Sequence, residues 1–219
     1  MSGFNIVSFF GSTDEQAMLR VQTCDDEEAF TELVRRWRLP IERLCTRMLG
    51  DIHRGEDLAQ ETFSKIYRRR KTYRGAGKFS TFLWQVAVNA CYDELRKLKC
   101  RPESSLEGLN DPDGEGQERF RSEEPGPDET VLAGERAETV RSALQAIPDI
   151  YRSVLILRHY ENLKFREIAS VLEIPEGTVK SRMAEGLDLL SRALQRQDKS
   201  EFKICKTITK RRFPETNLI

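Results

Sequence analysis

Four polar side chains that could bind a nucleic-acid base lie on one line of the segment 85–96. They are Gln85, Asn89, Tyr92 and Arg96, spaced by four, three and four residues, so on a helix they share one side. Amide, phenol and guanidinium groups can hydrogen-bond to an unstacked base and stack on it. A solvent-facing seam explains the same spacing equally well, so both interpretations stay open at this point.

A basic segment surrounds this line. It includes the loop "KTYRGAGK", whose glycines allow backbone shapes that other residues avoid. Between residues 65 and 101 the only acidic residues are Asp93 and Glu94. The basic residues there are Lys65, Arg68, Arg69, Arg70, Lys71, Arg74, Lys78, Arg96, Lys97, Lys99 and Arg101. Positive charge beside the polar line favours contact with phosphates.

The polar line belongs to a predicted helix at 79–99 that has two apolar faces. The first face consists of Phe79, Phe82, Leu83, Val86, Ala87 and Ala90. The second face, at heptad spacing, consists of Trp84, Val88, Cys91, Leu95 and Leu98. Apolar residues at helical spacing are normally buried, so we expect most of these aromatics in the core.

A helix-turn-helix is predicted in "NLKFREIASVLEIPEGTVKSRMAEGLDLL". Its short second helix, placed at about 100° per residue, is expected to bury Val179, Met183, Gly186, Leu187 and Leu190. The outward face then presents Gly177, Thr178, Ser181, Ala184 and Glu185, with Lys180 and Arg182 on either side. Small or polar residues with flanking cations are typical of a helix that reads a DNA groove. An ordinary helical hairpin is the alternative.

The remaining periodicity is also helical. Apolar residues recur at helical spacing in the segments 29–49, 58–67, 131–147 and 151–160, and no alternation typical of strands competes. The acidic segment 101–128 is rich in Pro, Gly and Ser and predicts a flexible linker. We therefore expect an all-α fold of two small helical domains, at 13–100 and 129–196. An extension at 1–12 and a basic tail at 197–219 flank them.

Composition excludes several classes of protein. Lys+Arg and Asp+Glu number 36 each, so the net charge of zero gives no global nucleic-acid signal. The five cysteines lack metal-site spacing and predict reduced thiols, and we expect no metal or cofactor. No segment approaches the roughly 20 apolar residues of a membrane span, so the expected location is the cytoplasm without membrane insertion. A catalytic residue set is not recognisable either, which argues against an enzyme.

Three stretches in this order resemble the sigma-70 family of bacterial transcription initiation factors, in particular its small extracytoplasmic-function (ECF) type. They are "GEDLAQETFSKIYRR", "FSTFLWQVAVNACYDELRK" and "IASVLEIPEGTVKSR", and the resemblance covers about residues 13 to 195. It implies a protein that binds core RNA polymerase and promoter DNA and has no catalytic activity of its own. An anti-sigma factor is a further candidate partner.

The resemblance also implies roles for particular residues. The helix carrying Asp57, Leu58, Gln60, Glu61 and Phe63 would bind the clamp helices of the polymerase beta-prime subunit. Arg74, Lys78, Phe79 and Asn89 would recognise the minus-ten element as a single strand, and Gln85, Tyr92 and Arg96 of the polar line would join them. The second domain would sit on the beta flap and read the minus-thirty-five element through Gly177, Thr178, Lys180, Ser181, Arg182 and Glu185. The acidic linker resembles the segment that threads toward the RNA exit path.

Two features depart from the family's pattern. Ala184, Glu185, Gly186 and Leu187 stand where relatives often carry an arginine-rich run, so some expected phosphate contacts are missing. The family suggests no role for the tail at 197–219. A stand-alone helix-turn-helix regulator is the main alternative function, although it leaves the "DLAQETF" helix and the basic loop unexplained.

Overall fold

The described part of the chain is helical throughout, which confirms the all-α prediction. The computed structural model describes residues 13–73, 77–100 and 137–212, with side chains as far as Arg196. The first half of the molecule contains α1 (Asp14–Cys24), α2 (Glu27–Leu49), α3 (Ile52–Arg68), the short 3-10 helix η2 (Arg70–Thr72) and α4 (Phe79–Cys100). The second half contains a helix at 137–145, then α6 (Asp149–His159), α7 (Phe165–Leu172) and α8 (Glu176–Arg212). The predicted linker at 101–128 and the extension at 1–12 lie outside the described residues.

Side-chain caps fix where the first three helices begin. Thr13 forms a capping box with Gln16, and α1 follows it directly. The carboxylates of Asp26 and Asp51 accept hydrogen bonds from the backbone N–H groups of Ala29 and Arg54, at 2.9 and 3.0 Å, at the starts of α2 and α3. These caps satisfy donors that a helix leaves free in its first turn.

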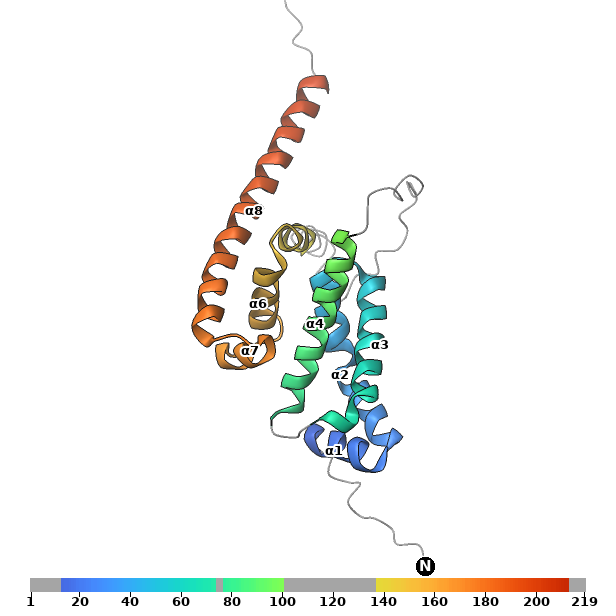
Figure 1. Ribbon diagram of the computed structural model, residues 1–219. Helices are drawn as coiled ribbons and strands as arrows, with labels where there is room; N and C mark the ends of the chain where they lie inside the picture. Colours follow the sequence, from blue (N-terminus) through green and yellow to red (C-terminus); the bar gives the residue numbers. More distant parts are fainter. Residues whose placement is uncertain (1–12, 74–76, 101–136, 213–219) are drawn as a thin grey trace, which may run out of the picture.

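The first half packs α2, α3 and α4 side by side, with α1 across one end (Figure 1). Leu33, Leu44, Ile66 and Leu83 from the three long helices are completely buried in this core. The rings of Trp37 and Trp84 meet edge to face, with centroids 5.7 Å apart. The core therefore fixes α4 on both of its apolar faces, as its sequence predicted.

The second half packs α6 against both α7 and α8. Its core contains Leu155, Ile156, Ile168 and Val179, all essentially inaccessible to solvent. A Cβ atom at Gly186 would lie 3.3 Å from Leu155, so α8 and α6 approach closely there. The short connection 173–175 between α7 and α8 confirms the predicted helix-turn-helix.

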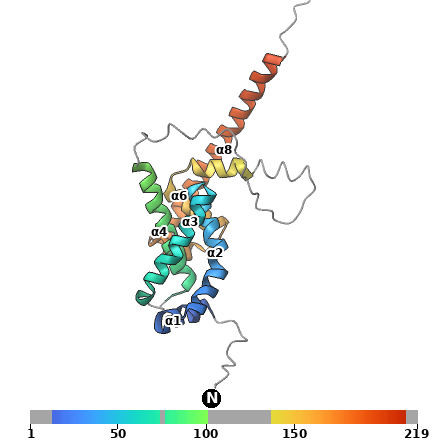
Figure 2. The same ribbon diagram turned by 90° about the vertical axis from the view of Figure 1, so that its right-hand side faces the viewer.

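Helix α8 is much longer than the short second helix that the sequence predicted. It extends to Arg212 and projects away from the other helices (Figures 1 and 2). The segment 197–212 contains neither Pro nor Gly and has four lysines and two arginines, which favour helices. The predicted boundary at residue 196 thus falls inside a continuous helix.

The closest approach of α3 to α2 yields a stability prediction. A Cβ atom at Gly55 would lie 2.3 Å from Thr46 Oγ1 and 2.7 Å from its backbone nitrogen. Gly55→Ala should therefore lower the free energy of unfolding by about 1–3 kcal/mol, because the two helices must separate. Urea unfolding measures this loss. Gly177→Ala is the control, since nothing lies within 4 Å of its added methyl group, and equal stability of both variants would contradict the prediction.

Candidate nucleic-acid interface

The basic loop is held at both ends by α1. Gln22 Nε2 donates a hydrogen bond of 2.6 Å to the carbonyl oxygen of Tyr73 in the first part of the loop. After the loop, the backbone N–H of Phe79 donates one of 3.0 Å to Glu15 Oε1. Glu15 therefore satisfies a free donor at the start of α4, where a carboxylate also interacts favourably with the helix dipole. Arg74 lies outside the described residues.

Aromatic packing anchors the same loop. The Tyr73 ring is buried against Phe79 and Phe82, with centroids 6.3 and 5.3 Å away. Phe79 has only 1% of its surface exposed. In this conformation Phe79 belongs to the core, and its side chain is not available to a DNA base.

The four polar residues of α4 differ in their exposure. Asn89 and Arg96 are exposed, whereas Gln85 and Tyr92 are half-buried. The Tyr92 hydroxyl lies 2.6 Å from Ser153 Oγ on α6. Burial raises the pKa of the Tyr92 phenol above its ordinary value.

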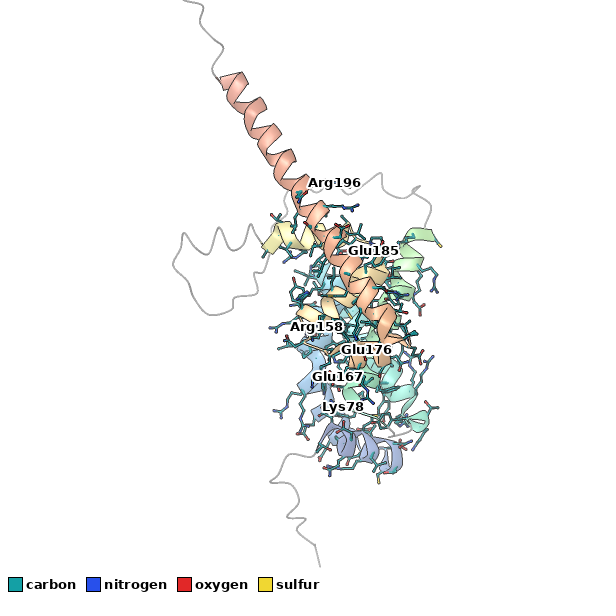
Figure 3. The ribbon with its side chains drawn as sticks, turned by 90° about the vertical axis from the view of Figure 1, so that its left-hand side faces the viewer. Lys78, Arg158, Glu167, Glu176, Glu185 and Arg196 are labelled. Atoms are coloured by element: carbon teal, nitrogen blue, oxygen red, sulfur yellow. The ribbon has the colours of Figure 1, made fainter. Side chains whose placement is uncertain are left out.

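Acidic residues partner several of the basic side chains. Asp25 binds both Arg70 and Lys71, and these hydrogen bonds lower the pKa of its carboxyl group. Lys78 forms an ion pair of 2.9 Å with Glu167 on α7, which Figure 3 shows beside it. The cationic surface near the loop is therefore smaller than the sequence suggests.

The candidate polymerase-binding residues of α3 separate into two groups. Asp57, Gln60 and Glu61 are exposed, while Leu58 and Phe63 are only 5% and 6% exposed and pack into the core. Glu61 forms an ion pair of 3.0 Å with Lys65, whose hydrogen bond lowers the pKa of the Glu61 carboxyl group. A shallow groove runs between α2 and α3 beside these residues, lined by Val34, Arg38, Glu42, Ala59, Gln60 and Phe63.

The outward face of α8 largely follows the prediction. Gly177, Ser181, Ala184 and Glu185 are exposed, and Thr178 is half-buried. Figure 3 shows Glu176 and Glu185 along the accessible side of the helix. Lys180 pairs with Glu176 at 2.8 Å.

Two residues of α8 lie differently from expectation. Leu187, predicted to face inward, is 44% exposed, because it stands about 80° around the helix from buried Val179. Arg182, expected at the edge of the outward face, is half-buried and near enough to Tyr92 to influence the pKa of that phenol.

Sequence patterns did not predict the polar residues that bring the second half onto α2 and α4. These are Gln145, Asp149, Arg152, Ser153, Glu161 and Glu167. Arg152 carried the one available signal, since it stands in the apolar run "YRSVLIL", and a cation in a buried segment requires partners.

Comparison with known proteins decides the family. A model described as "Sigma-70 region 2" matches residues 33–100, and one described as "Sigma-70, region 4" matches residues 137–190. The ECF RNA polymerase sigma factor SigW of Bacillus subtilis is 34% identical over 176 residues, covering 78% of this chain and 91% of the relative. The chain belongs to the sigma-70 family.

Further relatives agree with this assignment to ECF sigma factors. The RNA polymerase sigma-H factor of Pseudomonas aeruginosa is 34% identical over 183 residues, covering 83% of this chain and 94% of its own. The ECF RNA polymerase sigma-E factor of Escherichia coli K12 is 32% identical over 190 residues, covering 84% and 95%.

Two solved structures share the fold. CnrH in complex with the cytosolic domain of CnrY has a TM-score of 0.61 at 19% identity, covering 84% of this chain and 98% of that one. RpoE of Bartonella quintana with the anti-sigma factor NepR has a TM-score of 0.58 at 16% identity, covering 76% and 96%. None of the helices described for our chain is long and apolar enough to cross a membrane.

Proposed function

We propose that this sigma factor divides promoter recognition between its two halves. It directs promoter-specific transcription initiation as a subunit of RNA polymerase. The exposed side of α3 is the proposed docking surface for the beta-prime clamp helices, and the second half docks on the beta flap. The polar line of α4 binds the minus-ten strand, and the outward face of α8 reads the minus-thirty-five element. We assign no catalytic step to the chain and place it in the cytoplasm, where polymerase acts.

One observation favours this proposal over the alternative of a stand-alone regulator. Regions 2 and 4 occur in this order on one chain, whereas a stand-alone helix-turn-helix protein would require only the second. Within region 2, exposed Asn89 on α4 and exposed Asp57 and Glu61 on α3 supply two separate polar surfaces. Co-purification with core polymerase followed by run-off transcription tests the proposal, and DNA binding without polymerase association would favour the regulator.

An anti-sigma factor is a further proposed partner. The two structural neighbours named above were solved with the cytosolic domain of CnrY and with the anti-sigma factor NepR. We extend such a partner to this chain as a proposal, which capture on the immobilised full-length protein, followed by inhibition of run-off transcription, would test.

Reversing charge on α3 should weaken polymerase binding. Asp57 and Glu61 lie one turn apart on an exposed side, so Asp57→Arg with Glu61→Arg alters the surface without removing core contacts. We expect at least a tenfold loss of affinity, about 1.4 kcal/mol, in a pull-down titration with core polymerase. Glu27→Arg with Glu28→Arg makes the same charge change on exposed positions of α2 and should bind normally. Unchanged binding of the α3 variant with normal circular dichroism would remove α3 from the polymerase interface.

Asn89→Ala should impair strand opening more than initial promoter binding. Loss of one or two hydrogen bonds to a flipped base costs about 1–3 kcal/mol, or roughly 5- to 150-fold. Permanganate reactivity of the holoenzyme on a promoter mapped after overexpression measures opening, and binding at low temperature measures the closed complex. Glu94→Gln, on a different side of α4, serves as control. An equal loss in closed-complex binding would contradict the assignment of Asn89 to the separated strand.

Glu185 should help to select the minus-thirty-five sequence. Its exposed carboxylate stands one turn beyond Ser181 and can accept a hydrogen bond from cytosine N4 in the major groove. Glu185→Arg should change the preferred base at one position by about 1–3 kcal/mol in a randomised minus-thirty-five library. Asp188→Arg, with the same charge change at another exposed site, should only raise binding to all sequences and steepen its salt dependence. Identical preference profiles for Glu185→Arg and the parent protein would leave phosphate repulsion as the whole effect.

A further inference from the structure

The last part of α8, residues 197–212, projects from the molecule without a neighbouring helix in the described structure (Figures 1 and 2). Four β-branched residues lie in this part, and such residues favour a helix less than Lys or Arg does. They are Ile204, Thr207, Ile208 and Thr209. Helices in proteins derive most of their stability from the packing of an apolar side. A partner that packs on this part of α8 would supply that stability.

One line of α8 carries apolar residues from the middle of the helix into its projecting part. Leu187, Leu190, Leu194, Ile204 and Ile208 fall on this line. Together with positions 197, 201 and 211 they alternate between steps of three and four residues, which is the heptad spacing of a helix that packs on another helix. We call this line, from Leu187 to Arg211, the seam.

The near end of the seam is only partly covered by the molecule itself. Val179 and Met183, earlier on α8, are buried in the core of the second half. Leu187 is 44% exposed, and Leu190 and Leu194 are half-buried. A strip of apolar surface therefore begins at Leu187 and leads toward the projecting part of the helix.

Positive charge and the proposed duplex-reading face lie on the other side of α8. Four lysines occupy a line about half a turn around the helix from the seam. They are Lys199, Lys203, Lys206 and Lys210. Ser181 and Glu185 stand on the same far side by their register. A partner on the seam would therefore leave the reading face open.

The polar residues of the seam determine which orientation of two identical helices is favourable. In a parallel pair each position meets its own copy, so two Glu201 carboxylates would face each other, and so would two Arg211 side chains. Like charges at such positions oppose association. In an antiparallel pair centred on residue 199, Glu201 stands opposite Gln197 instead. The amide of Gln197 can donate a hydrogen bond to that carboxylate.

We propose that the seam is an interface with a second copy of this chain, in which the two α8 helices pack antiparallel about residue 199. Leu194 then stands opposite Ile204 of the second copy, and Leu190 opposite Ile208. Every apolar layer is made twice, once on each side of the two-fold axis.

The ends of this pairing are also compatible with an antiparallel arrangement. Arg211 falls opposite Leu187, at the edge of the interface, where a guanidinium can reach water while its stem covers apolar surface. The paired stretch from 187 to 211 spans roughly three and a half heptads, the length over which a heptad pattern indicates a coiled coil.

Sedimentation velocity of the full-length protein tests the interface. The mass should rise from 25.3 kDa toward twice that value as the protein concentration is raised. Ile204→Glu with Ile208→Glu should weaken association at least tenfold, about 1.4 kcal/mol, because it places carboxylates in the apolar layers. Glu favours a helix more than Ile does, so the loss would not reflect unwinding of α8. Lys199→Glu with Lys206→Glu introduces two carboxylates on the opposite line and should associate like the parent.

Gln197→Lys tests the orientation of the two helices. In the antiparallel pair each introduced ammonium stands opposite Glu201 of the second copy, so two new ion pairs should tighten association roughly two- to thirtyfold. In a parallel pair the two ammonium groups would face each other and weaken it. Weaker association of this variant would therefore overturn the antiparallel arrangement.

Two further outcomes would overturn the interface itself. One is a parent protein that stays at 25.3 kDa at every concentration, which would show that a second copy does not occupy the seam. The other is undiminished association of the Ile204→Glu, Ile208→Glu variant, which would place the contact between copies elsewhere on the molecule.

Discussion

Helix α4 is buried on two sides, and the organisation of the molecule follows from this. The helix packs against both α2 and α3, and residues of both apolar sides are buried, so it cannot rotate without exposing one set. What remains between them is a narrow polar line. Helix α1 also holds the loop before α4 through Gln22 and Glu15. The polar line therefore begins at a fixed position along the axis of α4. A helix fixed in rotation and translation can present Asn89 to a partner without ordering it first, which lowers the entropic cost of binding.

Several basic side chains of the first half form ion pairs with acidic ones. This pairing reduces the area of unpaired positive charge that can attract DNA. Asp25 binds Arg70 and Lys71, and Glu61 binds Lys65. These pairs are partly exposed to solvent, so each contributes little to stability. Their larger effect is on recognition, since cations already bonded to carboxylates attract phosphates less strongly at long range. Exposed Arg96, on the same polar line as Asn89, forms an ion pair of 3.3 Å with Asp93 of its own helix.

Local periodicity predicted much of the fold and of the candidate sites. The spacing of Phe79, Leu83 and Ala87 identifies the buried side of α4, and Val179 and Met183 do the same for α8. Spacing gives the direction of a side chain relative to its own helix, but not what covers it. The Tyr92–Ser153 bond joins residues 61 apart in sequence, and no local pattern encodes that pairing. Leu187 was wrongly placed because an apolar residue at the edge of a buried arc is assigned by its type, whereas its burial depends on the neighbouring helix.

Helix α8 runs without interruption from the proposed duplex-reading face to Arg212, far from the other helices (Figure 1). Its 37 residues correspond to about 55 Å at the rise of an α-helix. A helix of this kind behaves as a stiff rod over such a length, so its far end moves through an arc when its first turns tilt. A change in tilt at Gly177 and Ser181, on the proposed duplex-reading face, is therefore converted into a larger displacement at Arg212. A molecule bound at that end would be displaced when the first turns of α8 tilt. A force on that end would, in turn, be transmitted to the first turns.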